Sequence, residues 1–451
     1  MATTFRPYAP DQETFLPPSV RDWLPEKHLA YFVSDTVDAL NLSAFYGCYD
    51  GDGRRNCPFD PRMMVKVLVY GYATGTFSSR KLATKLHEDV AFRVLCADNF
   101  PAHRTIADFR ERHLGEFHDL FVQVVQTAQE VGLVKLGTVA VDGTKVKASA
   151  SKHKAMSYGR MKQEQERLEA EIQELTQRAA QVDAEEDALH GAENSGEEIP
   201  EELRRREQRV AKITAAVKRL RERQTEEDRA QGRSEPQEPS SPSPSPSSAP
   251  SPLPAQKSKR PFGEPEDKKQ DNFTDPQSRI MKTSSGFEQC YNGQLAVDGD
   301  SRLIVAATIT QSAADSGQLV GMVDKVKEVT GRLPEEVLAD AGYRSEENFR
   351  ELEAKEVKAH VSLGREGKSK AVKSEEDSPC TSRMKKALES EEGKKSYSRR
   401  KGIVEPVNGW IKAILGFRQF SLRGLGKVSC EWNLVCMALN VRRLSLQMEW
   451  I

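Results

Sequence analysis

The stretch V-A-V-D-G-T-K-V at residues 139–146 decides the fold, because it closes a run of small and β-branched residues with a single acid, Asp142. A run of this kind followed by a small-residue turn predicts a buried strand over residues 137–142 that leaves a sheet after the acid. A second stretch, V-L-A-D-A-G-Y at residues 337–343, has the same form and ends its apolar run on Asp340. The sequence therefore predicts two strands that each carry one acid to a sheet edge.

A third acid, Glu405 in G-I-V-E-P-V, opens a helical pattern instead of closing a strand. A carboxylate is costly inside a core unless it binds a cation, so we interpret Asp142, Asp340 and Glu405 as the ligands of one divalent-metal site. Each acid also has a plainer interpretation. Asp142 and Asp340 are also typical turn residues at strand ends, and Glu405 is a first-turn acid that the helix dipole favours. Their joint occurrence, in order and on the expected elements, favours the metal site.

Three other acids, Asp298, Asp300 and Asp315, compete for the same role. The first two belong to Asp298-Gly299-Asp300, a turn that predicts a hairpin between two strands. We therefore expect these two to be structural, and Asp315 stays as a competing acid.

The elements around the acids follow the order strand, strand, strand, helix, strand, helix, strand, which is the ribonuclease-H-like order. In that order the first and fourth strands are neighbours, so Asp142 and Asp340 are expected side by side, and a final helix carries Glu405 across the same edge. The sequence thus predicts an α/β fold with a ribonuclease-H-like mixed five-stranded sheet and helices. The expected strands are residues 137–142, 287–298 and 302–310, the stretch that ends at Asp340, and residues 358–363, with helices at residues 316–329 and from Ser345.

The first 130 residues are predicted to form a helical N-terminal domain that binds DNA. Three helical patterns with short breaks lie in it, and Ser78-Ser79 provides a cap for the second, so the arrangement resembles a helix-turn-helix. The alternative is a helical platform whose cations merely face water. The predicted DNA contacts are Arg80, Lys81, Arg104 and Arg110.

An insertion is predicted to interrupt the catalytic domain. Apolar residues recur at heptad spacing on both sides of a polar break, which predicts an antiparallel coiled-coil hairpin, with dimerisation through it as an alternative. A Pro/Ser-rich segment follows and is predicted to be a disordered linker. The predicted boundaries are 1–130 for the N-terminal domain, 131–155 and 272–425 for the split catalytic domain, 156–225 for the hairpin, 226–271 for the linker and 426–451 for a C-terminal helix.

Composition bounds the class of protein. The chain has 451 residues, of which 37% are hydrophobic and 30% are charged, and its formal net charge is -1. No apolar run approaches the roughly 20 residues of a membrane-spanning helix, and the first residues lack a signal peptide, so we expect a cytoplasmic protein with no membrane partner. The seven cysteines include no C-x-x-C pair, which argues against a disulfide scaffold or a zinc finger and favours reduced thiols.

The chain resembles bacterial insertion-sequence transposases of the DDE class, and specifically the insertion sequence 1182 group. The likeness is nearly full length and includes T-I-A-D-F-R, D-A-G-Y and G-I-V-E-P-V-N-G-W-I-K. Related transposases carry a tyrosine, arginine, glutamate and lysine signature with six residues between glutamate and lysine, a gap that Glu405 and Lys412 keep. Tyr397 and Arg400 also have the spacing of the signature. Four residues separate Arg400 from Glu405 where the signature has three, which leaves Arg399 and Lys401 as alternatives.

The resemblance implies that Asp142, Asp340 and Glu405 hold two Mg²⁺ ions, with Mn²⁺ as an alternative, for cleavage and strand transfer of DNA. It implies double-stranded DNA as partner, at the terminal inverted repeats and the target, no small-molecule substrate, a homodimer or larger paired-end complex, and action at the bacterial nucleoid. The basic residues near Glu405 would contact phosphates: Tyr397, Arg399, Arg400, Lys401 and Lys412. The alternative functions are a ribonuclease-H-like nuclease that does not join strands and an inactive DNA-binding or coiled-coil scaffold.

Overall fold

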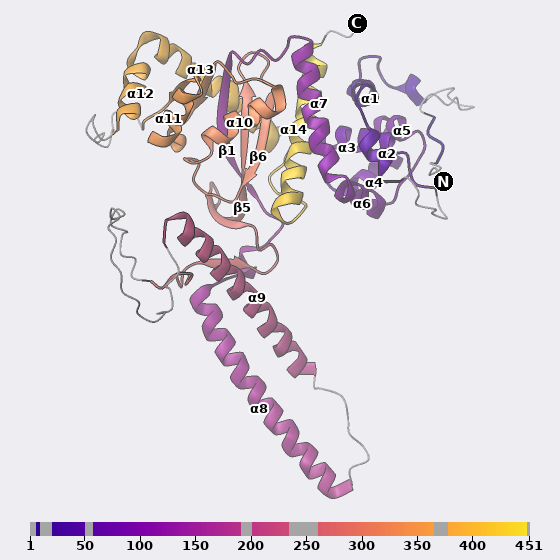
Figure 1. Cartoon of the computed structure of the whole chain (residues 1–451). Coiled ribbons are helices and arrows are strands. Elements are labelled where there is room, and N and C mark those ends of the chain that lie inside the picture. The colour runs from indigo at the N-terminus through magenta and orange to yellow at the C-terminus, as the bar shows by residue number, and fades with distance from the viewer. Residues whose placement is uncertain are drawn as a thin grey trace, which may run out of the picture. The chain divides into compact units, whose positions relative to one another are not determined.

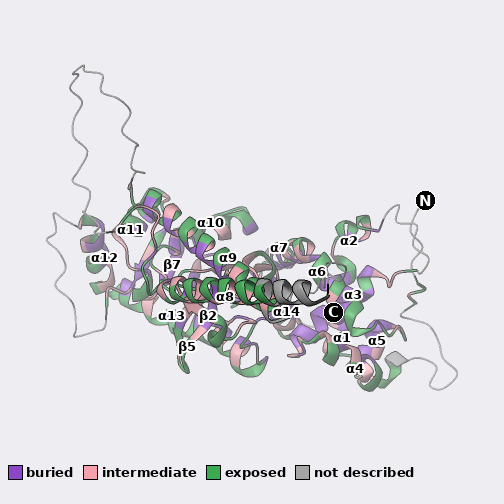
Figure 2. Cartoon of the chain, turned by 90° about the horizontal axis from the view of Figure 1, so that it is seen from below, coloured by how far each residue is buried: buried purple, intermediate pink, exposed green. Residues whose placement is uncertain are grey.

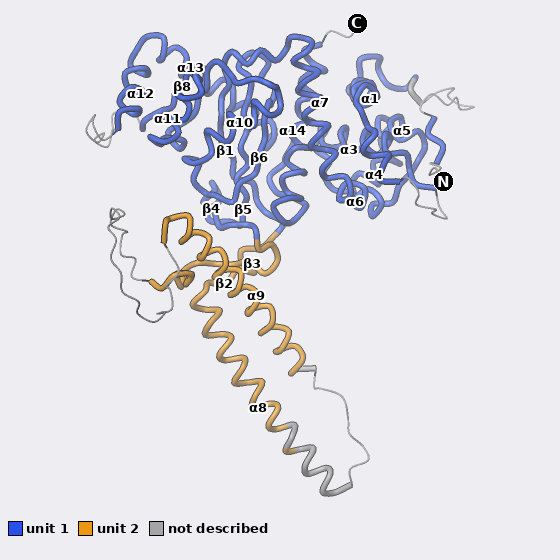
Figure 3. Tube along the Cα trace, viewed as in Figure 1, with its two compact units in different colours: residues 1–149, 277–451 blue, residues 150–276 orange. Residues whose placement is uncertain are grey.

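The structure is a computed structural model that describes residues 6–9, 20–49, 57–190, 201–233, 260–364 and 378–448. It contains two compact units (Figure 3): unit 1 is Met1–Ser149 with Gln277–Ile451, and unit 2 is Ala150–Pro276. All seven cysteines are free thiols, as predicted. Within the described ranges, no helix combines the length and the apolar character needed to span a membrane.

A mixed six-stranded sheet forms the centre of unit 1 (Figure 1). Its strands are β1 (Thr138–Lys147), β4 (Arg279–Thr283), β5 (Gly286–Asp298), β6 (Ile304–Thr310), β7 (Glu336–Ala339) and β8 (Lys358–Val361). β1 lies between β5, which is antiparallel to it, and β7, which is parallel to it. β6 pairs with β5, and β8 pairs with β7. The first and fourth predicted strands are therefore neighbours, as expected. The predicted count of five strands was too low, because β4 also pairs with β5.

β1 is longer than predicted, and this changes the place of Asp142. β5 pairs with β1 from Val139 to Lys147, so the chain does not turn after Asp142 and Gly143 continues the strand. β7 pairs with β1 only as far as Ala140. Asp142 therefore lies in the middle of a strand, two residues beyond the last β1–β7 pair, where β1 has lost its neighbour on that side.

Helices in the second half of the chain cover the sheet and position its acids. They are α10 (Leu319–Thr330), α11 (Glu346–Ala354), α12 (Pro379–Glu389), α13 (Glu391–Gly409) and α14 (Leu425–Gln447), and a 3-10 turn over Ala341–Tyr343 follows β7. α10 packs on β5 and β6, whereas α13 contacts β1, β7 and β8. α13 contains Pro406, which cannot donate a helical hydrogen bond, and it continues into a π-helical turn at Trp410–Ile414.

The N-terminal helices belong to the same compact unit as the sheet. They are α1 (Leu29–Ala39), α2 (Ser43–Gly47), α3 (Pro61–Ala73), α4 (Ser79–Glu88), α5 (Val90–Cys96), α6 (His103–Arg112) and α7 (Leu114–Glu130), preceded by a 3-10 turn at Val20–Trp23. α14 contacts α1, α3 and α7 as well as β6, and its Trp432 is fully buried. The predicted boundary at residue 130 therefore does not separate two compact units.

Unit 2 is built on two long antiparallel helices, α8 (Tyr158–His190) and α9 (Glu201–Ala230). Their shared core includes Leu168 from the first predicted heptad series and Ile213, Val217 and Leu220 from the second. Arg206 pairs with Glu171 and Arg209 with Glu164 across the helix pair. Figure 2 shows mainly exposed and half-buried residues along α8.

Unit 2 also contains a two-stranded antiparallel sheet, formed by β2 (Ala155–Ser157) and β3 (Gln270–Asn272). α9 continues to Ala230 and residues 260–272 fold beside it, so the predicted linker at 226–271 was too long at both ends. The predicted tip of the hairpin, at 191–200, and most of the Pro/Ser-rich segment, at 234–259, lie outside the described residues.

Candidate active site

Asp142 is half-buried and has other acids around it. Burial is the main reason why the pKa of its carboxyl is raised to about 6. The guanidinium of Arg400 lowers this pKa, whereas the carboxylates of Asp340 and Asp315 raise it. A carboxyl that is both buried and close to other carboxylates favours a proton or a metal ion over an isolated negative charge.

Asp340 directly follows β7 and begins the 3-10 turn over Ala341–Tyr343. Its Oδ1 accepts a hydrogen bond of 2.8 Å from the backbone N–H of Gly342. A side chain at Gly342 would come within 2.9 Å of the same oxygen, so it would push the Asp340 carboxylate aside. Parallel pairing of β7 with β1 sets Thr138 beside Glu336 and Ala140 beside Leu338, and continued at the same register it sets Asp142 beside Asp340.

Glu336 fixes α13 across the edge of the sheet. Its carboxylate accepts hydrogen bonds from Ser396 of α13 at 2.6 Å and from Thr138 of β1 at 2.9 Å, and it lies 2.8 Å from Nδ1 of His360 on β8. Burial alone would raise the pKa of Glu336, but the hydrogen bonds from these partners lower it to about 2. One ionised acid thus joins α13 to three strands, and this contact determines which residues of α13 reach the site.

One face of α13 and of the π-helical turn is directed along β1. Lys401, Glu405, Asn408 and Lys412 recur every three or four residues and so share this face. Nδ2 of Asn408 donates a hydrogen bond of 2.9 Å to Oδ2 of Asp142, and Nζ of Lys412 donates one of 2.9 Å to the backbone oxygen of Lys145. Glu405 lies one helical turn before Asn408, and its side chain is 56% exposed.

Of the two candidate arginines, Arg399 and Arg400, it is Arg400 that lies close to the acids of the site. Its side chain is only 8% exposed, and its Nη2 lies 3.8 Å from Oε1 of Glu405. Its charge also lowers the pKa of Asp142. Arg399, in contrast, points to Thr138 at 3.4 Å and to Asp300 at 3.7 Å. One more residue separates Arg400 from Glu405 than in the signature, but Arg400 still lies beside Glu405 and Asp142.

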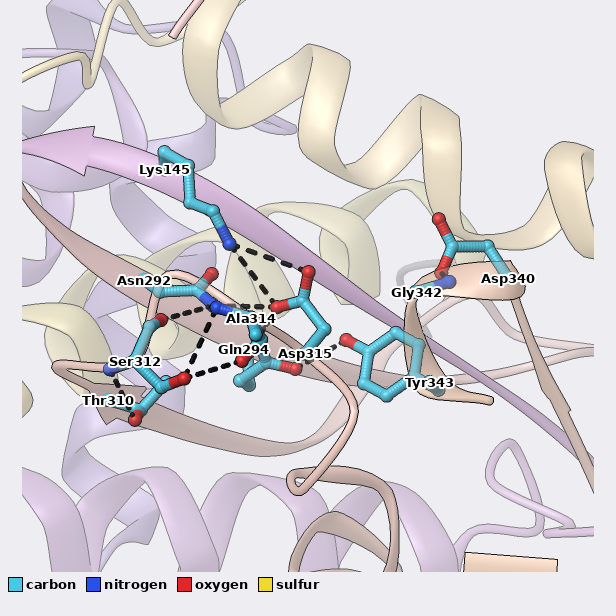
Figure 4. Close-up of polar contacts among 10 residues, drawn as sticks. All are labelled: Lys145, Asn292, Gln294, Thr310, Ser312, Ala314, Asp315, Asp340, Gly342 and Tyr343. Atoms are coloured by element: carbon cyan, nitrogen blue, oxygen red, sulfur yellow. Dashed lines mark hydrogen bonds and ion pairs between the residues drawn. The ribbon is translucent and has the colours of Figure 1, made fainter. Parts of the chain in front are cut away.

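Asp315 is the acid nearest to these residues that the prediction did not select (Figure 4). Its carboxylate accepts hydrogen bonds from Asn292 at 2.6 Å and from Gln294 at 2.8 Å, and Nζ of Lys145 lies 3.3 Å away. The hydroxyl of Tyr343 donates to Oε1 of the same Gln294. Asp315 is thus held by three side chains of β1 and β5 and raises the pKa of Asp142 from this fixed position.

Two buried amide oxygens near Asp142 lack a partner. They are Oδ1 of Asn408, whose Nδ2 holds Asp142, and Oδ1 of Asn292, whose Nδ2 holds Asp315. Buried acceptors of this kind are normally satisfied by water or by an ion. Carboxylates and amide oxygens together are the ligands that Mg²⁺ and Mn²⁺ prefer, so the residues present fit a divalent cation.

The three predicted acids do not form one tight cluster. Among the described residues, only Cys48, His113 and Glu116 place three possible metal-ligand atoms within 4.8 Å of one another. The structure brings Asp142 and Asp340 together, and it places Glu405 on the adjoining helix with its side chain directed to Arg400. Asn408, Asn292, Gln294 and Lys145 were not predicted from the sequence.

Two family models match the chain. Residues 251–441 match the transposase DDE domain, and residues 18–112 match a transposase domain, DUF772. The chain belongs to the DDE transposases. The first match covers every strand of the sheet except β1 and includes Asp340, Glu405 and α13. No curated protein and no solved structure gave a match.

As a DDE transposase, the chain cleaves phosphodiester bonds in DNA and transfers the strands by transesterification. Enzymes of this family use divalent metal ions, which agrees with the oxygen-rich surroundings of Asp142. The family match favours this activity over the two alternatives, a nuclease that does not join strands and an inactive scaffold.

The structure divides the predicted DNA contacts of the transposase into exposed and buried residues. Arg80, Lys81 and Arg104 are exposed on α4 and α6. Arg110 is only 6% exposed, and its Nη1 donates hydrogen bonds to the hydroxyl of Tyr72 at 2.9 Å and to the backbone oxygen of Phe77 at 3.0 Å. These internal contacts argue against Arg110 as a DNA contact, because its charge is used inside the protein. Near Glu405, Lys401 is exposed, whereas Tyr397 and Lys412 are half-buried.

Proposed function

We propose that Asp142, Asp340 and Glu405 hold two Mg²⁺ ions in a ribonuclease-H-like domain that cuts the ends of its own element and joins them to target DNA. The observation that carries the proposal is the pairing of β1 with β7, because its register, continued by two residues, sets Asp142 beside Asp340, and α13 packs on both strands. The order of β6, β5, β1, β7 and β8 across the sheet supports the ribonuclease-H-like assignment. We assign the element to the insertion sequence 1182 group on the motifs around Asp340 and Glu405.

Asp142, Asp340 and Glu405 would hold the ions, and divalent metal bound there would supply Lewis-acid charge for in-line displacement at phosphorus. Asp142 and Asp340 are set by neighbouring strands. Glu405 reaches the same edge from α13, and its exposed side chain can turn from Arg400 toward them. The attacking group is water when an end is nicked and the freed 3′-hydroxyl when it is joined, so the protein forms no covalent bond to DNA.

The cations around Glu405 would hold the phosphates beside the scissile bond. Lys401 is exposed on the face that carries Glu405, and Arg399 is close to half-exposed. Lys412 already donates to the backbone of β1, but an ammonium group has three donors and retains two for a phosphate. Tyr397 and Arg400 complete the set. Such contacts position the DNA and do not read its sequence.

Binding of the inverted repeats is assigned to α4 and α6 of the N-terminal helices, which contact each other and expose Arg80, Lys81 and Arg104. This pair would act as the helix-turn-helix-like element. Because an element has two ends, we propose that two or more copies of the chain assemble on the DNA. The work would take place at the bacterial nucleoid.

A strand-transfer assay tests the function and the need for metal. A labelled, pre-nicked end mixed with plasmid target should give joined product with Mg²⁺ or Mn²⁺, and removal of the metal by EDTA should abolish the product without releasing the bound end. Gel-shift binding in the same buffers provides the control. Cleavage without any joined product would contradict the proposal, and so would joining that persists in EDTA.

The raised pKa of Asp142 predicts a pH dependence of metal binding. Metal ligands must be deprotonated, and a carboxyl with a pKa of about 6 is increasingly protonated below that pH. The Mg²⁺ concentration for half-maximal strand transfer should therefore rise by up to about tenfold per pH unit below pH 6 and stay flat above pH 7. End binding in EDTA at each pH serves as the control. A half-maximal concentration that does not change between pH 5 and 7 would contradict a metal ligand whose pKa is raised to about 6.

A further inference from the structure

A second group of metal-ligand side chains lies among the N-terminal helices, and the transposase reaction does not use it. Sγ of Cys48, a ring nitrogen of His113 and a carboxylate oxygen of Glu116 all lie within 4.8 Å of one another. Cys48 follows α2, His113 separates α6 from α7, and Glu116 is in the first turn of α7. Two segments of the chain, one at Cys48 and one at residues 113–116, therefore contribute the three ligand atoms.

The distances in this group suit a tetrahedral metal ion. Oε1 of Glu116 lies 3.6 Å from Sγ of Cys48 and 3.6 Å from Nδ1 of His113. Ligand atoms at the corners of a zinc tetrahedron, each about 2.0–2.3 Å from the ion, are about 3.5 Å apart. An imidazole N–H donating to a carboxylate would instead bring the two atoms to about 2.7–3.2 Å. The distances from the Glu116 carboxylate to Cys48 and His113 are therefore those expected between two ligands of one zinc ion.

His113 provides the independent sign of a missing partner. Its side chain is 0% exposed, and its Nδ1, which faces Glu116, makes no hydrogen bond. Its other nitrogen, Nε2, lies 3.3 Å from the hydroxyl of Tyr49. Metal-bound histidines commonly use their second nitrogen in this way, which fixes the ring and directs the lone pair of the first nitrogen at the ion. Phe45 stacks on the ring, and Phe109 packs against it at a tilt, so the two hold its orientation.

A simple ion pair between His113 and Glu116 explains the group less well, because Nδ1 of His113 and Oε1 of Glu116 are 3.6 Å apart and make no hydrogen bond. A metal ion bound here would displace the thiol proton of Cys48, since zinc binds the thiolate.

We propose that Cys48, His113 and Glu116 bind one Zn²⁺ ion, with water in the fourth position. The mixed sulfur, nitrogen and oxygen donors select zinc, whereas the all-oxygen ligands around Asp142 select magnesium. The ion would join the end of α2 to the corner between α6 and α7. It would thereby fix α6, which exposes Arg104.

Cobalt and zinc titrations of the full-length protein test this site. After the purified protein is stripped with a chelator, Co²⁺ alone should bind at one tight equivalent per chain and give thiolate-to-cobalt absorption with the visible bands of tetrahedral cobalt. The oxygen-only site at Asp142 cannot produce the thiolate band. The Cys48→Ser variant should lose that band, Glu116→Gln should weaken Zn²⁺ binding at least tenfold, and the exposed-thiol control Cys57→Ser should behave as the wild type.

A stability measurement separates loss of the site from loss of the fold. Saturating Zn²⁺ should raise the Tm of the wild type and of Cys57→Ser by roughly 3–6 °C, and that of Glu116→Gln by much less. The Glu116→Gln protein keeps the size of its side chain and should have the circular dichroism of the wild type. Absence of the thiolate band in the wild type, or an undiminished band in Cys48→Ser, would overturn the proposal. Neither result would bear on strand transfer.

Discussion

An Asp142→Asn variant should bind transposon ends like the wild type and lose cleavage and strand transfer by about 1,000-fold or more. Changes to residues that merely hold a metal ligand cost about 10–100-fold, so loss of the ligand itself should exceed that range. Asn408, which donates to Asp142, supplies the graded comparison: Asn408→Ala should lose about 10–100-fold. The measurement is the rate of joined product at saturating Mg²⁺.

The control for this variant is another acid on a helix that covers the sheet. Asp324 of α10 is 49% exposed and pairs with Lys355, so Asp324→Asn should retain full activity. Asp142→Asn should also remain folded, because burial disfavours the charge that it removes and the asparagine oxygen can still accept from Asn408. Strand transfer within tenfold of the wild type in a folded Asp142→Asn protein would end the assignment of Asp142 as a ligand.

An Arg110→Met variant should lower the free energy of unfolding by about 3 kcal/mol, because it leaves a buried acid without its cation. The acid is Glu431 of α14, which is 1% exposed and receives a hydrogen bond of 3.2 Å from the hydroxyl of Tyr72. Arg110 donates to the same hydroxyl, so Tyr72 links the two charges. Backbone N–H groups of Ser421 and Leu422 also donate to Glu431, and they limit the loss. Urea unfolding followed by circular dichroism measures the change.

Arg104→Met on the same helix is the matched control, with the opposite pattern of effects. Arg104 is exposed, so its replacement should change stability by less than about 0.5 kcal/mol while weakening end binding. Arg110→Met should weaken end binding only to the extent that it unfolds the protein. If Arg110→Met has normal stability but a large loss of DNA affinity, Arg110 contacts DNA after all.

The sheet was predictable because local pattern and chain order both point to it. Apolar runs in β1, β5, β6 and β7 identified the strands, and their order predicted that β1 and β7 are neighbours. The end of β1 was not predictable from its own residues. Gly143 reads locally as a turn, but it stays in the strand because the long partner β5 continues to pair beyond it. β4 was not predicted because the hairpin pattern indicates only the pairing of β5 with β6, whereas β5 also pairs with β4.

The acids of the site were predictable one by one, and their surroundings were not. Asn292 and Gln294 alternate on β5 within an otherwise largely apolar run, and this alternation is a sequence signal of polar side chains on one face of the strand. Asn408 follows Glu405 by three residues, a spacing that places both on one helix face. Asp315 lies in a loop, and its contacts depend on how β1, β5 and that loop meet in space. The same holds for Cys48, His113 and Glu116, whose spacing matches no common zinc motif.

The position of α14 has a consequence for synthesis of the protein. This helix lies against the first helices of the chain and against the sheet, and Arg442 donates to the backbone oxygen of Ala73 across 369 residues of sequence. On the ribosome, the segment up to α7 is made long before the helix that covers it. The nascent chain therefore carries exposed apolar surface, open to chaperones and proteases, through most of translation. A premature stop codon before α14 would deprive the helices and the sheet together of their common support.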